Sequence, residues 1–525
     1  MIPTAGMALA TLLSLSLAAA SEATVTGPVR IQSGLVAGVA EPEGVVVAFL
    51  GIPYAAPPLG DLRWREPQAP PAWAGVRAAD RSGARCVQAL SAPSLPFSLM
   101  QPKEAAIVQP PSEDCLHLDV FTPARTGADR LAVLVNLGRV AGGRLARQGI
   151  VVVSVDHRVG IIGGMGHPEL SRESPHHLSG DYGFLDLIAA LQWVHRNITA
   201  FGGDPDRVTV AGYSVGSAFV HHLTASPVAK GLFRGAICMS FPYDYLLTRD
   251  KVGNVWQKEQ EGLQFAAAKH ASGIADLRRL PATDLLAPDP LLAPFTRAVL
   301  GSVICVDGWA LPAQYPQAFA QGLSSDVPTL TGFPVDDGVP PHAFQKCRMA
   351  TFPADLASAF GRSAAAYDGR KGAYLALVAP GSDEEARSLC ERAQVEFRAA
   401  STVHWVRRRA QTARTPVYGY VFTRVIPCPE HPEFGAFHTS DLPYLFDNLD
   451  TLNHPWTSVD RQVAAQVSAY WANFVKHLDP NGDGLPTWAP LTPDEPTTMA
   501  LGERCAPLPI APERMRFYLD LLEDP

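Results

Sequence analysis

The sequence has little cysteine, no excess of positive charge and few long apolar runs, and each shortage excludes a class of protein. Eight cysteines in 525 residues are too few for a disulfide scaffold, and none has the close spacing of structural zinc ligands, so we expect no metal site or cofactor. Lys and Arg number 43 against 51 Asp and Glu, without a basic run, so nucleic acid is not an expected partner. Beyond the amino-terminal segment no run reaches the roughly 18 apolar residues of a membrane span.

What the chain does contain is enough apolar sequence for a large core. Hydrophobic residues make up 47% of the chain and charged residues 18%. At about 150 residues per domain, the length alone allows three domains. The 47 prolines are spread throughout, and no repeat or linker stands out, so we predict one domain over residues 21–525 with long insertions.

The first 20 residues have the features of a signal peptide. Residues 7–17 are apolar and uncharged, and the stretches Ala-Ala-Ala at 18–20 and Ser-Glu-Ala at 21–23 offer two small-x-small cleavage sites. We therefore predict a soluble mature protein that is secreted or periplasmic and able to form disulfides. Because no Lys or Arg precedes Arg30, an apolar and unstructured start is the alternative.

Apolar, β-branched runs alternate with helical patterns along the chain. Short buried strands are predicted at residues 131–135, 150–155, 207–211, 235–239, 328–332 and 417–422. Residues 182–198 and 458–477 have the apolar spacing of helices, and the first of these is followed by a Gly-Gly-Asp-Pro stop at 202–205. Strands that alternate with helices imply an α/β protein with a mostly parallel central sheet and helices on both faces.

A G-x-S-x-G pattern provides the first catalytic candidate. Ser214 is the central residue of the stretch 212–216, which lies between a predicted strand and a helical pattern over 218–224. A nucleophile elbow needs this strand–turn–helix context, because its sharp turn lifts the serine hydroxyl clear of the backbone. A serine hydroxyl is a poor nucleophile until a base takes its proton, so a histidine and an orienting carboxylate are expected further along.

Three further stretches complete a resemblance to a known family. They read Phe-Leu-Gly-Ile-Pro-Tyr-Ala at 49–55, Ser-Glu-Asp-Cys-Leu at 112–116 and Phe-Gly-Gly-Asp-Pro at 201–205. With the elbow at the expected spacing, the chain from about Val29 to about Tyr518 resembles the type-B carboxylesterases, which include the cholinesterases. The resemblance implies an α/β-hydrolase fold and hydrolysis of a small-molecule carboxylic ester through an acyl-enzyme.

The resemblance also assigns catalytic residues. Ser214 takes the place of the nucleophile. The stretch 332–338 matches the family's G-x-x-x-D-E-G pattern and puts Asp337 in the place of the acid, with Asp for the usual Glu. The stretch 435–444 matches the histidine loop of the family and makes His438 the base. The order Ser, acid, His is that of the α/β-hydrolases.

The remaining cysteines and histidines carry less information. The resemblance implies a disulfide between Cys86 and Cys115, near the entrance of the active site. The pairing of the other six is open: Cys238, Cys305, Cys347, Cys390, Cys428 and Cys505. The pairs His176-His177 and His221-His222 have no further ligands at metal spacing, so we interpret both as helix or loop surface.

The chain departs from the family where the oxyanion would be bound. The fold normally uses N–H groups from a His-Gly-Gly-Gly loop and from the residue after the nucleophile. Residues 136–144 contain no such loop, and roughly 15 to 20 residues are missing by comparison with the family's spacing. Val215 is the expected donor after the nucleophile, and Gly138, Gly142 or Gly143 is a candidate for the other if the short loop folds over Ser214.

Two functions therefore stay open. The first is a secreted serine carboxylesterase that forms an acyl-enzyme on Ser214, and the complete Ser-acid-His set favours it. The second is a catalytically impaired relative kept for binding, which the missing loop favours. The sequence does not indicate the acyl or alcohol preference or the oligomeric state.

Overall fold

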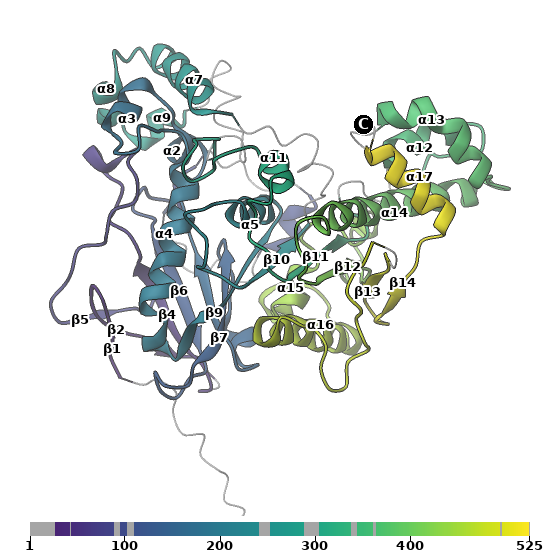
Figure 1. Cartoon of the computed structure of the whole chain (residues 1–525). Coiled ribbons are helices and arrows are strands. Elements are labelled where there is room, and N and C mark those ends of the chain that lie inside the picture. Colours follow the sequence, from purple (N-terminus) through teal and green to yellow (C-terminus); the bar gives the residue numbers. More distant parts are fainter. Residues whose placement is uncertain are drawn as a thin grey trace, which may run out of the picture.

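The computed structural model describes residues 27–42, 44–88, 95–101, 110–240, 253–287, 304–337, 344–360, 364–493 and 496–523. The predicted signal peptide at 1–20 lies outside these residues. A mixed sheet of eleven strands runs through the molecule, with helices on both sides (Figure 1). The mostly parallel, doubly covered sheet predicted from the sequence is thus confirmed.

The strand order of the large sheet is β14-β13-β12-β11-β10-β9-β7-β8-β6-β4-β3. The strands are β3 (Val39–Ala40), β4 (Val47–Pro53), β6 (His117–Thr122), β7 (Leu131–Leu137), β8 (Val151–Val155), β9 (Gly203–Tyr213), β10 (Gly235–Met239), β11 (Thr329–Pro334), β12 (Val417–Phe422), β13 (Thr498–Leu501) and β14 (Ala506–Leu508). Pairing is parallel from β8 through β13 and antiparallel at both ends. A separate small sheet contains β1 (Val29–Ile31), β2 (Gly34–Ala37) and β5 (Val76–Ala78).

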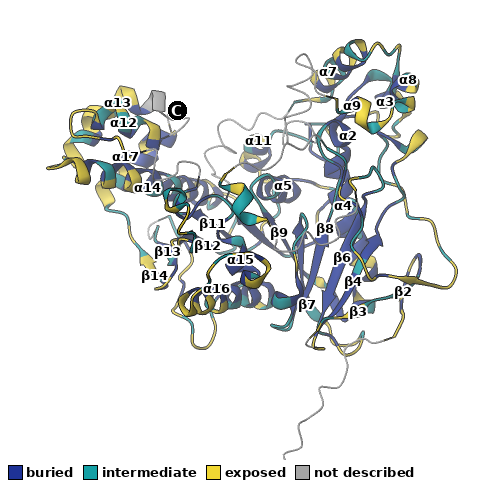
Figure 2. Cartoon of the chain, turned by 180° about the vertical axis from the view of Figure 1, so that it is seen from behind, coloured by how far each residue is buried: buried dark blue, intermediate teal, exposed yellow. Residues whose placement is uncertain are grey.

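The central strands are buried on both faces, which explains why they read as continuous apolar runs. All five residues of β8 are buried, and Figure 2 shows the middle of the sheet as buried throughout. Val133 and Val135 of β7 belong to one apolar cluster, whereas Leu134 belongs to another, as the alternation of side chains along a strand requires.

One face of the sheet is covered by α4 (Tyr182–Asn197), α5 (Val215–Thr224) and the end of α14 (Asp383–Arg409). The other is covered by α1 (Gly143–Ala146), α15 (Leu442–Leu445) and α16 (Ser458–His477). The helix predicted at 182–198 is confirmed, but it is buried on most of its circumference rather than on one face, because α2 (Gly160–Gly164) packs against it.

Two helical lobes lie outside the sheet (Figure 1). The first contains α2, α3 (Pro168–Glu173), α7 (Val255–Ala268), α8 (Ile274–Arg279) and α9 (Ala282–Leu285). The second, called here the carboxyl-terminal lobe, contains α12 (Phe352–Ala359), α13 (Ala364–Leu377), the first part of α14 and α17 (Pro512–Glu523). The remaining helical segments are α11 (Tyr315–Ala320), η1 (Gly60–Leu62), η2 (Phe97–Met100), η3 (Ile198–Phe201), η6 (Pro432–Phe434) and η7 (Leu449–Thr451). None of the described helices has the length and apolarity needed to span a membrane.

Candidate active site

Ser214 lies in the tight turn between β9 and α5, as the sequence predicts for a nucleophile elbow. Its backbone has φ 53° and ψ −122°, a conformation that residues other than glycine rarely adopt. Its N–H donates to the Met239 carbonyl at 2.8 Å, which holds the turn against β10. A Cβ on Gly212 would lie 2.3 Å from the Gly216 carbonyl oxygen, so the turn closes only with glycine at this position.

His438 and Asp337 are in direct contact. The imidazole Nδ1 lies 3.1 Å from both carboxylate oxygens of Asp337, so the carboxylate orients the ring and favours the tautomer with the proton on Nδ1. Asp337 comes just after β11 and is buried, whereas His438 lies in the loop after β12 and is partly exposed. The structure therefore brings together the acid and the base that the resemblance implied.

The neighbouring Asp336 ties the same two loops to each other. Its N–H donates to the Ala436 carbonyl at 3.1 Å, and its carboxylate accepts from the Ala436 N–H at 2.7 Å. The Asp-Asp pair thus has divided roles, since one carboxylate contacts the imidazole and the other fixes the histidine loop. Sequence reasoning considered only the first role.

Arg398 of α14 also contacts the acid, and no motif in the sequence indicated it. Its Nη1 lies 3.3 Å from Asp337 Oδ1, and its guanidinium lies over the Phe333 ring at 5.6 Å. Burial raises the pKa of Asp337, but the charge of Arg398 and the contact with His438 outweigh burial and hold that pKa below its ordinary value. Asp337 therefore stays ionised beside the imidazole.

The pKa of His438 shifts the other way. Burial lowers it, but the hydrogen bond and charge of Asp337 outweigh burial, so the pKa of the imidazole lies above its ordinary value. A second buried carboxyl, Asp441, accepts a hydrogen bond from the Tyr420 hydroxyl at 3.2 Å. Burial, reinforced by the charge of Asp337, raises the pKa of Asp441 to about 7. The site thus contains one ionised carboxylate and one that is partly protonated at neutral pH.

Ser214, Asp337 and His438 lie beyond the carboxyl ends of β9, β11 and β12, which belong to the same parallel part of the sheet. This edge is where open α/β sheets bind ligands. Within the described part of the chain, no hydrogen bond joins Ser214 Oγ to His438. The ring of Phe97, from η2, stands edge-on to the imidazole with centroids 6.2 Å apart.

The short loop after β7 is hydrogen-bonded to β8. The Gly138 N–H donates to the Val155 carbonyl at 3.0 Å, and the Val140 N–H donates to Ser154 Oγ at 2.9 Å. The loop thus satisfies its backbone on β8, and this geometry disagrees with Gly138 as an oxyanion donor. Val215 is the first residue of α5, where N–H groups have no acceptor within the helix.

The residues that follow β8, next to this loop, make structural contacts. Asp156 pairs with Arg139, and burial raises the pKa of Asp156 to about 6 although the charge of Arg139 opposes it. The half-buried His157 ring stands edge-on to Phe219, with ring centroids 5.5 Å apart, and loss of solvation lowers the pKa of His157 to about 4. These groups occupy the space beside the elbow.

The predictions for the other cysteines and histidines have mixed outcomes. Cys86 and Cys115 are joined by a disulfide, as the resemblance implied. His176 and His177 are exposed, as expected. The surface interpretation of His221-His222 is wrong, because α5 is covered by α11 and α14 and both side chains are buried. Burial lowers the pKa of His221 to about 3, so it is a neutral core residue.

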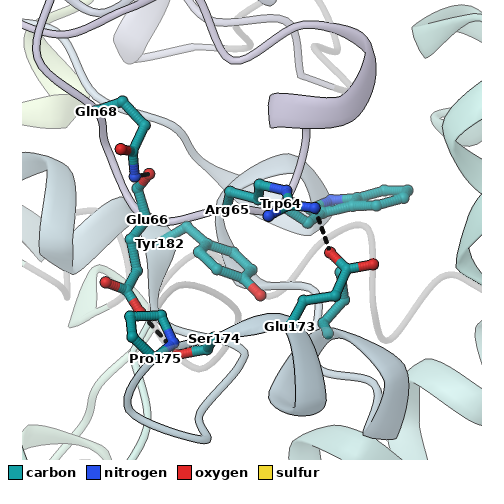
Figure 3. A pocket seen from close by; sticks show the side chains of 9 residues that line it. Trp64, Arg65, Glu66, Gln68, Glu173, Ser174, Pro175 and Tyr182 are labelled. Atoms are coloured by element: carbon teal, nitrogen blue, oxygen red, sulfur yellow. Dashed lines mark hydrogen bonds and ion pairs between the residues drawn. The ribbon is translucent and has the colours of Figure 1, made fainter.

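A small cavity of about 70 Å³ lies elsewhere, between Trp64 and Tyr182 (Figure 3). Its polar side chains are tied to one another, since the Ser174 hydroxyl donates to Glu66 at 2.7 Å and Arg65 pairs with Glu173 at 3.2 Å. None of the three candidate catalytic residues lines this cavity. Among the described residues, no cluster of three or more His, Cys, Asp or Glu side chains could hold a metal ion.

Comparison with known proteins finds relatives over most of the chain. Residues 26–517 match the Carboxylesterase family. Fumonisin B1 esterase of Sphingopyxis macrogoltabida is 33% identical over 486 residues, which cover 87% of this chain and 83% of that protein. Cocaine esterase of Homo sapiens is 30% identical over 488 residues, which cover 84% of this chain and 81% of that protein. The solved structure of a PNB esterase is 27% identical and superposes with a TM-score of 0.70, covering 94% of this chain and all of that one.

Proposed function

The chain belongs to the carboxylesterase family of carboxylic ester hydrolases, and from this premise we propose that it is an active serine esterase. Ser214 Oγ attacks the ester carbonyl while His438 Nε2 takes its proton. His438 then protonates the leaving alcohol, and an acyl-enzyme remains on Ser214. A water molecule, deprotonated by the same imidazole, attacks the acyl carbonyl and releases the acid and the free serine.

The observation that carries this proposal is the contact between His438 Nδ1 and both oxygens of Asp337 at 3.1 Å. With the proton on Nδ1, the lone pair is on Nε2, which is the atom that must accept the serine proton. The ionised carboxylate then stabilises the imidazolium that forms during the attack. A purely structural histidine has no need of a buried carboxylate, an arginine behind it and a strained serine on the same sheet edge.

Stabilisation of the oxyanion is the weakest part of the catalytic machinery. Val215 N–H is the donor that we assign, and the N–H groups of Gly138 and Val140 are engaged on β8. Loss of one oxyanion donor typically lowers kcat by 10² to 10³. We therefore expect turnover well below that of a complete site, with the acyl-enzyme still formed.

The test is hydrolysis of p-nitrophenyl acetate and butyrate by the purified protein and by Ser214→Ala. We expect measurable hydrolysis that Ser214→Ala lowers to the background rate and Asp337→Asn lowers by at least about 10²-fold. Ser217→Ala changes a buried serine three residues further along, in α5, and is the matched control that should keep most of the activity. Equal rates for the wild type and Ser214→Ala would refute the esterase proposal.

The second candidate function is a binding protein with impaired catalysis, and the engaged N–H of Gly138 is the observation that favours it. A fluorophosphonate probe separates the two functions, because covalent labelling requires an activated serine but not turnover. Labelling of Ser214 with slow ester hydrolysis would support the weakened enzyme. Absence of labelling in a folded protein would favour the binding function.

For the substrate and the location, we propose carboxylic esters of small molecules and export from the cytoplasm. Fumonisin B1 and cocaine, named in the relatives, belong in a substrate panel beside the p-nitrophenyl esters. Export is supported by the apolar segment at 7–17 and by the disulfide between Cys86 and Cys115. The intact mass of the exported protein tests this, since cleavage after residue 20 leaves Ser21 first, and an uncleaved chain would contradict it.

A further inference from the structure

Two cysteines outside the active site lie side by side in the carboxyl-terminal lobe. The sulfur atoms of Cys347 and Cys390 are 3.6 Å apart, and both residues are buried. Cys347 lies in a turn before α12, where its N–H donates to the Phe344 carbonyl at 2.9 Å. Cys390 lies in the first part of α14, which is 43 residues further along the chain. The fold therefore brings together two thiols that are distant in sequence.

We propose that Cys347 and Cys390 form a second disulfide in the mature protein. The bond goes beyond the esterase function and does not depend on it. A disulfide bond is about 2.05 Å long, so the two sulfurs need to approach by about 1.5 Å. Rotation of the Cys347 side chain in its turn supplies such a movement without shifting α14.

The other cysteines make this pairing specific. Cys86 is bonded to Cys115. Cys305 and Cys505 donate to other groups, namely the Ser179 carbonyl at 3.6 Å and Gln466 Oε1 at 3.3 Å. Cys238 is buried in β10, and Cys428 lies in the segment after β12. Of the six cysteines outside the existing disulfide, Cys347 and Cys390 are the two whose sulfurs are in contact.

The lobe gives the crosslink a structural purpose. Its core is smaller than that of the sheet and includes eight aromatic side chains among 22 buried residues, with Phe360 packed against Tyr367 and Phe397. Figure 1 shows the lobe to one side of the sheet, joined to it through α14. Small cores stabilise a fold weakly, so a covalent link that closes a loop of 43 residues contributes a large share of the lobe's stability.

Formation of the bond needs an oxidant from the compartment. The thiolate of one cysteine attacks an external disulfide, either of a dithiol oxidase or of oxidised glutathione, and gives a mixed disulfide. The second thiolate then displaces the external sulfur. In sum two protein thiols lose two electrons and two protons, and the external disulfide is reduced to two thiols. Because both cysteines are buried in the folded lobe, we expect this exchange during folding, before the lobe closes.

Peptide mapping tests the proposal directly. The full chain is exported to an oxidising compartment, purified, alkylated in denaturant without reductant and digested. We expect a Cys347–Cys390 linked peptide beside the Cys86–Cys115 peptide, with the other four cysteines alkylated. The Cys86–Cys115 peptide is the internal control for an oxidising environment. Alkylation of both Cys347 and Cys390 in protein that carries the complete control bond would overturn the proposal.

Variants add a second readout. Cys347→Ala should free Cys390 for alkylation and lower the Tm of the lobe by roughly 3–8 °C. Cys505→Ala, a buried cysteine elsewhere, is the matched control and should leave the linked peptide intact. Reductant should lower the Tm of the wild type more than that of Cys347→Ala, in which this bond is already absent. An equal shift in both proteins would contradict the proposal, and the mapping of the wild type decides even if a variant fails to fold.

Discussion

At the scale of single residues, the acid of the site shows how a shorter side chain is accommodated. Asp337 is one methylene shorter than the usual Glu of this family, yet both of its oxygens reach His438 Nδ1 at 3.1 Å. The hydrogen bonds between Asp336 and Ala436 join the two loops, which holds Asp337 within reach of the imidazole. Arg398 then holds the Asp337 carboxylate from the opposite side.

We predict that Arg398 is a positioning residue that also sets the pH dependence of catalysis. A base must be neutral to accept the serine proton, so kcat/KM rises as His438 loses its proton, with a midpoint above the ordinary histidine pKa. The charge of Arg398 opposes protonation of His438. Arg398→Gln should therefore raise the pKa of His438 and move the acidic limb of the kcat/KM profile to higher pH.

The profile distinguishes this role from a merely structural one. In Arg398→Gln, activity lost at pH 7 should return in part at pH 9, whereas general damage would lower the rate at every pH. Arg398→Lys retains the charge and should restore most of the wild-type midpoint. Arg392→Gln removes an exposed arginine from the same helix and is the control. An unchanged midpoint in Arg398→Gln would show that its charge does not reach the imidazole.

Sequence reasoning finds one part of this site and misses another for a physical reason. Ser214 and His438 lie in contiguous motifs, so short stretches of sequence identify them. Arg398 contacts Asp337, but it comes from a helix that no motif marks. Contacts of this kind follow from how α14 crosses the end of the sheet, and one sequence without the fold does not contain that information.

At the scale of elements, α16 shows how local chemistry and tertiary contacts reinforce each other. Thr457 and Asp460 form a capping box at its amino end, where each side chain accepts from the backbone of the other. Asp460 also accepts from Arg424 Nε at 2.7 Å and from the Tyr444 hydroxyl at 2.8 Å. One buried carboxylate thus caps the start of the helix and connects it to α15 and to the segment that follows β12.

We predict that Asp460→Asn lowers the free energy of unfolding by about 2–4 kcal/mol, because it leaves Arg424 without its buried partner. Hydrogen bonds from Arg424 and Thr457 outweigh burial and lower the pKa of Asp460 to about 2. This contribution is complete above the ordinary aspartate pKa and is lost as the pH falls toward 2. Urea denaturation at several pH values measures it.

The control is Asp450→Asn, which removes the partner of two arginines at an exposed site. Arg144 and Arg461 both contact Asp450, but all three side chains are at least 36% exposed, so the loss should stay below about 1 kcal/mol. If both variants lose the same stability, burial does not explain the role of Asp460.

The positions of the elements are the best-predicted part of the structure. Apolar runs of four to eight residues bounded by turns indicate β7, β8, β10 and β12 directly, because strands buried on both faces have no polar side to interrupt the pattern. The surroundings of a helix are harder to predict. Histidine is a polar residue that usually indicates a surface position. His221 and His222 belong to the core only because α11 and α14 pack over α5.

At the scale of the whole molecule, α17, which contains the last described residues, is linked to the candidate active site through α14. Arg514 pairs with Glu396 of α14 through two contacts at 2.7 and 2.8 Å, and the Tyr518 hydroxyl donates to the same carboxylate at 2.9 Å. Two residues further along α14, Arg398 contacts Asp337. One helix, α14, therefore contacts both α17 of the carboxyl-terminal lobe and Asp337, the acid of the site.

We predict that removal of residues 512–525 unfolds the carboxyl-terminal lobe and lowers esterase activity, although α17 contains none of the candidate catalytic residues. The side chains of α17 that are buried include Phe517, Tyr518, Leu521 and Leu522. Burial of each one stabilises the fold by about 1.5–3 kcal/mol. The sum for the four side chains is as large as the whole stability expected of a small core, so the lobe should not stay folded without them. Limited proteolysis should then cut the truncated chain within 344–409.

Tyr518→Phe is the control, since it keeps the packing of the ring and removes one hydroxyl. It should lower the free energy of unfolding by about 1 kcal/mol and create no new cleavage site. Since α14 carries both Glu396 and Arg398, fraying of the lobe should displace Asp337 and lower kcat more than it raises KM. A truncated protein that resists protease and retains kcat would show that α14 is held by the sheet alone.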